Sequence, residues 1–117
     1  MSGLGKNGER IAAVYLALKD YHIEQRNFHS RFGEIDLIAK KRGLTVFVEV
    51  KTRGKNALSA PAAAVDTYKQ RKLSKTAEYY ITRSGCYDDE LRFDVVEIEL
   101  YRLHFRIRHI KNAFYPE

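Results

Sequence analysis

The sequence predicts an α/β domain built on a mixed β-sheet, with the element order α-β-β-β-α-β-β. Three observations favour this fold: an apolar pattern of helical period near the N-terminus, two β-branched runs joined by a short turn, and a second helical segment followed by two further strands. The chain has 117 residues, and 44% of them are hydrophobic. A chain of this length and composition can bury one core, so we expect a single domain over residues 1–117.

Two helices are expected. The first spans about residues 6–19, where apolar side chains recur every three to four residues in two adjacent rows. Such a helix is apolar over more than one stripe and should be well buried, and Glu9 lies on its second row. The second helix is predicted to begin at Pro61 and to run to about Arg83. Proline favours the first turn of a helix, and Gly85 favours an end at that point.

The strands surround a predicted hairpin. Residues 35–39 and 44–51 are β-branched or apolar runs. The turn between them contains Gly43, which permits the positive φ that a tight turn needs. The remaining strands are predicted over residues 23–28, 93–99 and 103–109.

The hairpin places two acidic residues opposite each other. If the loop is the two residues Arg42–Gly43, the numbers of facing residues sum to 85. Asp36 then faces Glu49. By the same register Glu34 faces Lys51. A three-residue loop would shift the register by one and remove this pairing.

The facing pair of Asp36 and Glu49 needs a compensating cation. Opposed side chains have Cβ atoms about 4.5–5.5 Å apart, and like charges at that distance repel. The other face of the first hairpin strand is also apolar, with Ile35, Leu37 and Ala39. That pattern is typical of interior strands, where an uncompensated carboxylate is costly. Because an oxygen-only ligand set favours Mg²⁺ or Mn²⁺, the sequence predicts such an ion between the two acids.

Lys51 and Glu9 would complete a site for phosphodiester hydrolysis. Lys51 lies two residues after Glu49 on the same strand face, where it would position an attacking water or stabilise charge on a phosphoryl group. Glu9 would add a further carboxylate from the first helix. A structural alternative stays open, in which Glu34 and Lys51 form a cross-strand ion pair. The two facing carboxylates would then sit at a solvated end of the sheet.

Lys69 falls on the sheet-facing side of the second helix. At 100° per residue it lies inside the apolar stripe of that helix. The stripe consists of Val65, Leu73, Thr76 and Tyr80. A lysine in this position has two interpretations: it reaches over the sheet toward the carboxylates or a bound phosphate, or it extends its ammonium group from the stripe to solvent.

The charge balance suits a polyanionic partner. Lysine and arginine number 21 against 15 aspartate and glutamate residues, which gives a net charge of +6. Basic residues that contact phosphates release counterions, and this favours binding of nucleic acid. A net charge of this size also serves solubility alone.

Composition excludes several other classes of protein. The single cysteine, Cys86, rules out an intramolecular disulfide and a zinc site of several cysteines. No apolar run approaches the roughly 20 residues that span a membrane, and no secretory signal is recognisable. We therefore expect a cytoplasmic protein without a membrane partner.

Five segments of the chain, in order, resemble the bacterial YraN family. This family is assigned to the PD-(D/E)XK nuclease superfamily, with archaeal Holliday-junction resolvases as closer relatives. The resemblance extends over nearly the whole chain and implies a restriction-endonuclease-like fold, in which helices flank a mixed sheet. The five segments are GE (residues 8–9), GEIDLI (33–38), VFVEVKTR (46–53), RFDVV (92–96) and HIKNAF (109–114).

The resemblance assigns roles to individual residues. Asp36 and Glu49 match the metal ligands of the superfamily, and Lys51 matches its catalytic lysine. Glu9 matches the helical glutamate that often completes such sites. Ile35 stands where the superfamily's name has proline. The basic residues expected to contact nucleic acid are Lys6, Arg53, Lys55, Lys69 and Lys72.

The resemblance implies a metal-dependent DNA endonuclease that uses Mg²⁺ or Mn²⁺ and acts on branched or otherwise structured DNA. Related resolvases pair up to cut two strands, which adds a homodimer to the expectations. Two other functions stay open: a non-catalytic nucleic-acid-binding module that retains the nuclease scaffold, and a structural or partner-binding protein.

Overall fold

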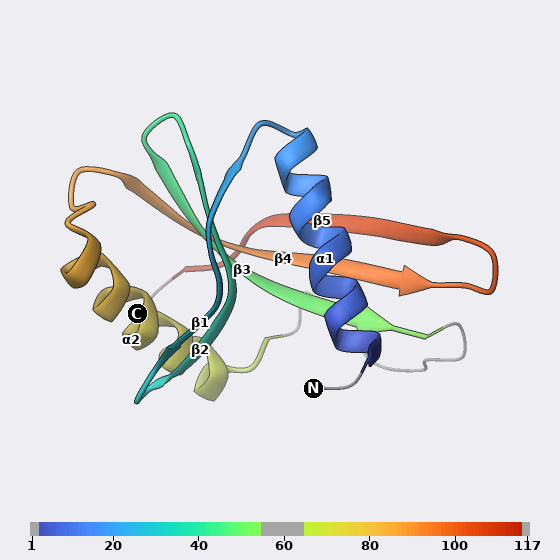
Figure 1. The fold of residues 1–117 in the computed structure, drawn as a ribbon. Helices are drawn as coiled ribbons and strands as arrows, with labels where there is room; N and C mark the ends of the chain where they lie inside the picture. The colour runs from blue at the N-terminus through green and yellow to red at the C-terminus, as the bar shows by residue number, and fades with distance from the viewer. Residues whose placement is uncertain (1–2, 55–64, 116–117) are drawn as a thin grey trace.

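The computed structural model describes residues 3–54 and 65–115, and within them the side chains from residue 7 onward. In this part of the chain two helices accompany one five-stranded sheet (Figure 1). The predicted order α-β-β-β-α-β-β is confirmed. The elements are α1 (Gly3–Leu18), β1 (His22–Ser30), β2 (Gly33–Lys41), β3 (Leu44–Arg53), α2 (Thr67–Ser84), β4 (Glu90–Leu100) and β5 (Phe105–Phe114).

The sheet is mixed, as predicted. Its strands lie in the order β1-β2-β3-β4-β5, and only β3 and β4 are parallel among these neighbours. A parallel pair needs a crossover connection, and α2 lies within it. Between β2 and β3, Leu37 pairs with Val48, so the numbers of facing residues sum to 85 as predicted. Arg42 and Gly43 have φ values of 45° and 78°, which is typical of a two-residue hairpin turn.

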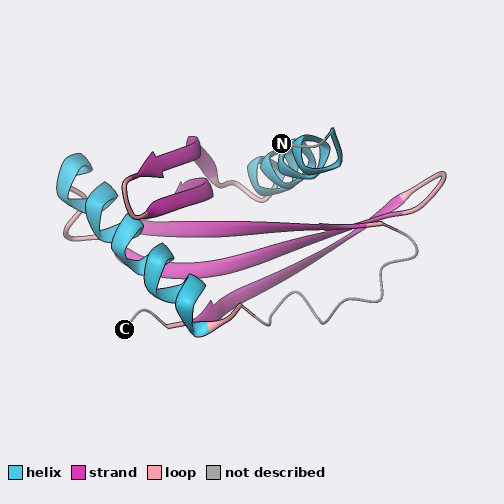
Figure 2. Cartoon of the chain, turned by 90° about the horizontal axis from the view of Figure 1, so that it is seen from below, coloured by secondary structure: helices cyan, strands magenta, loops and turns pink. Residues whose placement is uncertain are grey.

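The helices cover opposite faces of the sheet. Residues of β3 alternate between two buried clusters: Phe47 packs in the cluster that includes α2, whereas Val46 and Val48 pack in the cluster that includes α1. We call these surfaces the α2 face and the α1 face. Figure 2 shows the two helices well apart. Neither helix, over the residues described, has the length and apolar character needed to cross a membrane.

Helix α2 begins later than predicted. Pro61 lies outside the described residues, but the helix starts at Thr67, directly after Asp66. Asp66 is extended, with φ −70° and ψ 161°, and its side chain accepts a hydrogen bond from the backbone N–H of Lys69 at 2.8 Å. This N-cap sets the first helical residue. The predicted end is confirmed, since Gly85 adopts the left-handed conformation with φ 76°.

The last strand is shifted and longer than predicted. We expected it over residues 103–109, but it begins two residues later and ends at Phe114. A turn occupies the start of the predicted range: the backbone N–H of Tyr101 donates to the carbonyl of His104 at 2.8 Å, and their rings stack with centroids 4.6 Å apart. The local contacts of this turn override the strand pattern of residues 103 and 104.

Candidate metal and nucleic-acid site

Asp36 and Glu49 meet where the hairpin strands stop pairing. The backbone register of β2 with β3 runs from the turn to Leu37 and Val48, one residue short of the two acids. There the Oδ2 atom of Asp36 accepts a hydrogen bond from the backbone N–H of Val50 at 2.8 Å. The carboxylate therefore provides an acceptor for β3 at the end of the ladder. This contact holds Asp36 against the strand that carries Glu49.

Strand β2 changes faces at Asp36. Leu37 and Ala39 pack on the α1 face, but Ile35 packs on the α2 face together with Phe47. We expected Ile35, Leu37 and Ala39 on one face, because residues two apart share a face in a regular strand, and for Ile35 this was wrong. At this point β2 continues its pairing with β1 but not with β3. The irregularity leaves the side chain of Asp36 free to turn toward β3.

The two carboxylates form one electrostatic unit. Burial and the charge of Glu49 raise the pKa of Asp36 to about 7, although the hydrogen bond from Val50 opposes the shift. The charge of Glu9 raises the pKa of Asp36 further, and Lys69 lowers it. Glu49 is itself buried, with 8% of its surface exposed. A buried acid pair of this kind takes up a proton or a cation near neutral pH.

Lys69 reaches over the sheet to the acid pair, which is the first of its two predicted interpretations. Its Nζ atom donates to Oε1 of Glu49 at 2.7 Å. Burial alone would lower the pKa of Lys69, but the hydrogen bond and charge of Glu49, with the charge of Asp36, raise it overall. Since the backbone N–H of Lys69 is bound to Asp66, the N-cap of α2 positions this ammonium group.

Lys51 lies beside Lys69 rather than in an ion pair with Glu34. The carboxylate of Glu34 lies 3.2 Å from Nδ1 of His29, its register partner on β1. Lys51 is half-buried and acts on the pKa of Lys69. Among the residues with described side chains, the Glu34–Lys51 ion pair of the structural alternative is therefore absent. The site has two ammonium groups next to two carboxylates.

Glu97 is an acid near the site that the sequence analysis missed. It is the register neighbour of Lys51 on β4, and its side chain is 1% exposed. Its Oε2 atom lies 3.3 Å from Nη1 of Arg53, so the predicted nucleic-acid residue Arg53 makes an internal ion pair. The signal was available: Glu97 follows Val95 at strand period and lies between the apolar residues Val96 and Ile98.

The other predicted basic residues lie in different surroundings. Lys72 is exposed on α2, and its Nζ atom lies 5.0 Å from the centroid of the Tyr68 ring. Lys6 belongs to α1, but its side chain lies outside the described residues, as does all of Lys55. A hollow of about 340 Å³ opens beside Lys69. It is lined by Gly33, Glu34, Asp66, Tyr68, Lys69, Lys72 and Leu73.

The residues present fit a magnesium ion bound by two carboxylates. Mg²⁺ usually keeps several waters and takes one or two carboxylates from the protein. The hard oxygen atoms of Asp36 and Glu49 meet this requirement. A cation between them would also relieve the repulsion by Glu49 that raises the pKa of Asp36. No group of three histidine, cysteine, aspartate or glutamate side chains within the described part of the chain is arranged to hold a metal ion. Glu9 acts on Asp36 by its charge in this arrangement, and its role as a third ligand stays a prediction.

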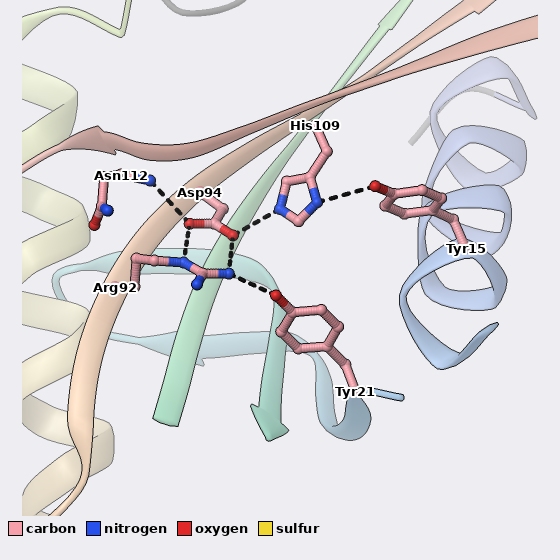
Figure 3. Close-up of polar contacts among 6 residues, drawn as sticks. All are labelled: Tyr15, Tyr21, Arg92, Asp94, His109 and Asn112. Carbon is pink, nitrogen blue, oxygen red and sulfur yellow. Dashed lines mark hydrogen bonds and ion pairs between the residues drawn. The ribbon is translucent and has the colours of Figure 1, made fainter. Parts of the chain in front are cut away.

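A second polar cluster lies on the α1 face, centred on Asp94 (Figure 3). Both oxygens of its fully buried carboxylate accept from Arg92, at 2.8 Å each, and Oδ2 lies 2.7 Å from Nε2 of His109. The backbone N–H of Asn112 also donates to Oδ1 at 3.2 Å. Burial alone would raise the pKa of Asp94, but the hydrogen bonds from His109 and Arg92 hold it below its usual range.

This cluster attaches α1 to the sheet. The hydroxyl of Tyr15 on α1 lies 3.1 Å from Nδ1 of His109, and the hydroxyl of Tyr21 accepts from Arg92 at 2.7 Å. An ionised Asp94 only accepts hydrogen bonds, so Nε2 of His109 carries the proton of that contact. Asp94 and His109 lie inside two of the family segments, where no role was expected for them. In the structure they fix the helix that carries Glu9 (Figure 3).

The fold and the site define a class: an α/β protein with a mixed five-stranded sheet, whose central hairpin carries a buried acid pair beside two lysines. The profile of the "Uncharacterised protein family UPF0102" matches residues 8–98. The chain belongs to the UPF0102 family, which is the YraN family of the sequence resemblance.

Relatives in this family match nearly the full chain. A UPF0102 protein of Geobacter sulfurreducens is 46% identical over 112 residues, which cover 95% of this chain and 88% of the relative. One from Persephonella marina is 43% identical over 110 residues, covering 94% and 91%. One from Caldanaerobacter subterraneus is 44% identical over 114 residues, covering 95% and 93%.

Proposed function

We propose that the protein is a metal-dependent endonuclease that hydrolyses DNA phosphodiester bonds at the acid pair of Asp36 and Glu49. The observation that carries this proposal is the raised pKa of Asp36 beside Glu49, with the ammonium groups of Lys51 and Lys69 at the same place. A pair of carboxylates short of positive charge attracts a divalent cation, and neighbouring ammonium groups suit a phosphate. The net charge of +6 supports a polyanionic substrate.

Mg²⁺ or Mn²⁺ would be held by Asp36 and Glu49. Such an ion, when bound, supplies polarisation of a phosphoryl oxygen and a water of lowered pKa. Glu9 would strengthen binding of the ion through its charge, as it already acts on Asp36. The carboxylates also orient solvent, because their oxygens accept hydrogen bonds from an attacking water.

Lys51 and Lys69 would have different roles toward the phosphate of the substrate. Lys51 lies on β3 next to the carboxylates and would stabilise the negative charge that develops on the transferred phosphoryl group. Lys69 neutralises Glu49 in the present conformation. If Glu49 held a metal ion, the ammonium group of Lys69 would be available to contact a phosphate oxygen of the substrate. Lys69 would then couple substrate binding to metal binding.

One observation favours a second candidate function, a nucleic-acid-binding module without catalysis. The ammonium group of Lys69 already compensates the charge of Glu49 at 2.7 Å, as a permanent structural cation would. In that case the acid pair is stable without metal. The basic residues around it would still bind phosphates in a salt-dependent manner.

Cleavage of labelled DNA separates the two functions. We expect the purified protein to cut junction, flap or duplex DNA with Mg²⁺ or Mn²⁺ but not with EDTA. Glu49→Ala or Lys51→Ala should lower the rate about 100-fold or more, because Glu49 would hold the metal ion and Lys51 would stabilise charge on the phosphoryl group. Matched controls are Asp88→Ala and Lys19→Ala, which change exposed residues away from the acid pair.

The outcomes are distinct. Absence of cleavage on all three substrates, or an unchanged rate in Glu49→Ala, contradicts the endonuclease. Salt-sensitive DNA binding without metal-dependent turnover would instead support the binding module. Branched or otherwise structured DNA, a homodimer that cuts both strands and a cytoplasmic location remain part of the proposal, and the substrate comparison and the oligomeric state in solution test the first two.

A further inference from the structure

Aromatic and basic side chains lie together along the outer side of α2. Tyr68, Lys72, Lys75, Tyr79 and Arg83 follow one another at intervals of four, three, four and four residues, and this spacing places them on one face of the helix. Phe32, from the turn between β1 and β2, lies against the same face, because Lys75 contacts its ring. We call these six residues the aromatic–basic stripe.

Each ring of the stripe carries a cation. The Nζ atom of Lys72 lies 5.0 Å from the Tyr68 centroid. Phe32 has Lys75 on its ring at 5.9 Å and Arg31 at 4.9 Å. The guanidinium of Arg83 lies 5.3 Å from the Tyr79 centroid and donates to the Tyr79 hydroxyl at 2.7 Å. Tyr68 is 69% exposed, so its ring is open to a ligand.

Two hollows open along the stripe. The first, of about 340 Å³, is lined by Tyr68 and Lys72 together with Gly33 and Glu34 of β2. The second, of about 350 Å³, is lined by Phe32, Lys75, Glu78, Tyr79 and Thr82. Each hollow combines an aromatic ring with an ammonium group, and each has the volume of a small-molecule pocket.

The stripe begins at the acid pair. Lys69, whose ammonium group binds Glu49, also lines the first hollow. From there the stripe follows α2 from Tyr68 to Tyr79, eleven residues that rise about 16 Å. That length corresponds to roughly five stacked bases at 3.4 Å each.

The composition of the stripe favours unpaired bases over a duplex. In a duplex the bases are stacked inside, so exposed rings gain little from it, and a surface for the backbone would be uniformly positive. Here Glu34 and Glu78 lie in the hollows among the basic residues. Exposed rings with adjacent cations are the combination that binds single strands without sequence preference.

We propose that the aromatic–basic stripe binds an unpaired strand of the nucleic acid, by stacking of bases on Tyr68 and Phe32 and by contacts of Lys72 and Lys75 with phosphates. This inference rests on the proposed function, in that it assigns the substrate a single-stranded segment next to the bond that is cut. It names a binding surface that the carboxylate site alone does not require.

Fluorescence anisotropy tests the stripe without cleavage. A labelled oligothymidylate of 20 nucleotides and a blunt duplex of equal length are titrated with the protein in EDTA. Tyr68→Ala should weaken binding of the single strand about tenfold, as loss of one stacked base does, and leave duplex binding within twofold. Tyr68→Phe keeps the ring and should keep the affinity. Phe105→Ala removes a half-exposed ring on the α1 face and should change neither.

The results separate this inference from the endonuclease. Unchanged single-strand binding in Tyr68→Ala, an equal loss for the duplex, or failure of Tyr68→Phe to retain affinity overturns the stripe. If the protein cuts DNA but Tyr68→Ala does not weaken single-strand binding selectively, the endonuclease proposal is supported and the proposed binding surface is contradicted. If Tyr68→Ala weakens single-strand binding selectively but no substrate is cut, the stripe stands and the endonuclease is contradicted.

Discussion

At the residue scale, the site depends on one irregularity of the backbone ladder. A regular β2 would use its main chain to satisfy the N–H of Val50, and the Asp36 side chain would stand perpendicular to the sheet. Instead the carboxylate of Asp36 accepts that N–H at 2.8 Å. The arrangement brings the acid close to Glu49 and raises its pKa to about 7. At this position the Asp36 side chain therefore replaces a backbone hydrogen bond between β2 and β3.

The raised pKa of Asp36 predicts a pH-dependent stability of the metal-free protein. The pKa of Asp36 is about 7 in the folded protein and has its ordinary value of 3.8 in the unfolded chain. Because the native state binds more protons between these values, its free energy of unfolding falls as pH rises from about 4 to 7. Asp36→Asn stays neutral and can still accept from Val50, so it should escape this loss. The free energy of unfolding of Asp36→Asn, relative to that of the wild type, should therefore increase by on the order of a few kcal/mol as the pH rises over this range.

Urea denaturation in EDTA at several pH values from 4.5 to 8 measures this difference. Titrating groups that do not interact with Asp36, such as Asp94, are common to both proteins and cancel in the comparison. A difference between the two proteins that stays constant over this range would show that Asp36 does not titrate near neutrality.

At the element scale, two contacts hold α1 on the sheet: the close packing of Gly8 against β3 and the hydrogen bond of Tyr15 to the Asp94 cluster. Gly8 is buried, and a Cβ atom at this position would overlap the hydroxyl of Thr52 on β3. Further along the helix, Tyr15 joins the buried cluster of His109 and Asp94 (Figure 3). These two attachments fix the orientation of α1, and with it the position of Glu9.

Gly8→Ala should therefore destabilise the protein even though alanine favours helices. The added methyl group forces α1 away from Thr52, and overpacking of this kind costs about 1–3 kcal/mol. Thermal or urea unfolding measures the loss. Asn7→Ala, at an exposed position of the same helix, is the control and should be neutral or slightly stabilising. Equal stability of Gly8→Ala and wild type would mean that α1 adjusts without cost.

At the scale of the whole molecule, metal binding should stabilise the fold. A ligand that binds only the native state adds about 2.7 kcal/mol at a concentration 100 times its Kd. We expect Mg²⁺ to raise the Tm by several degrees, because the ion relieves the repulsion between Asp36 and Glu49. Differential scanning fluorimetry with Mg²⁺ or Na⁺ at matched ionic strength measures the shift. Glu49→Gln should remove it, whereas an equal shift in this variant would show binding elsewhere.

The hairpin and the helix end followed from local chemistry. The two-residue turn at Arg42–Gly43 sets the register of β2 with β3 as far as Leu37 and Val48, and this register brings Asp36 and Glu49 near each other. The irregularity that turns the Asp36 side chain to the backbone of Val50 did not follow from it. The end of α2 at Gly85 was predictable, because only a few neighbouring residues determine it. The start of α2 lies at Thr67 rather than at Pro61, because the side chain of Asp66 caps the helix by accepting the backbone N–H of Lys69.

The element order and the hairpin register up to Leu37 therefore follow from residues close along the chain. Contacts between elements far apart along the chain place Ile35 on the α2 face, join Lys69 to Glu49 and anchor α1 to Asp94 through His109. These contacts join elements that the crossover from β3 to β4 brings together. Periodicity in a sequence reports which face of an element is apolar, and it carries no information about which distant element covers that face.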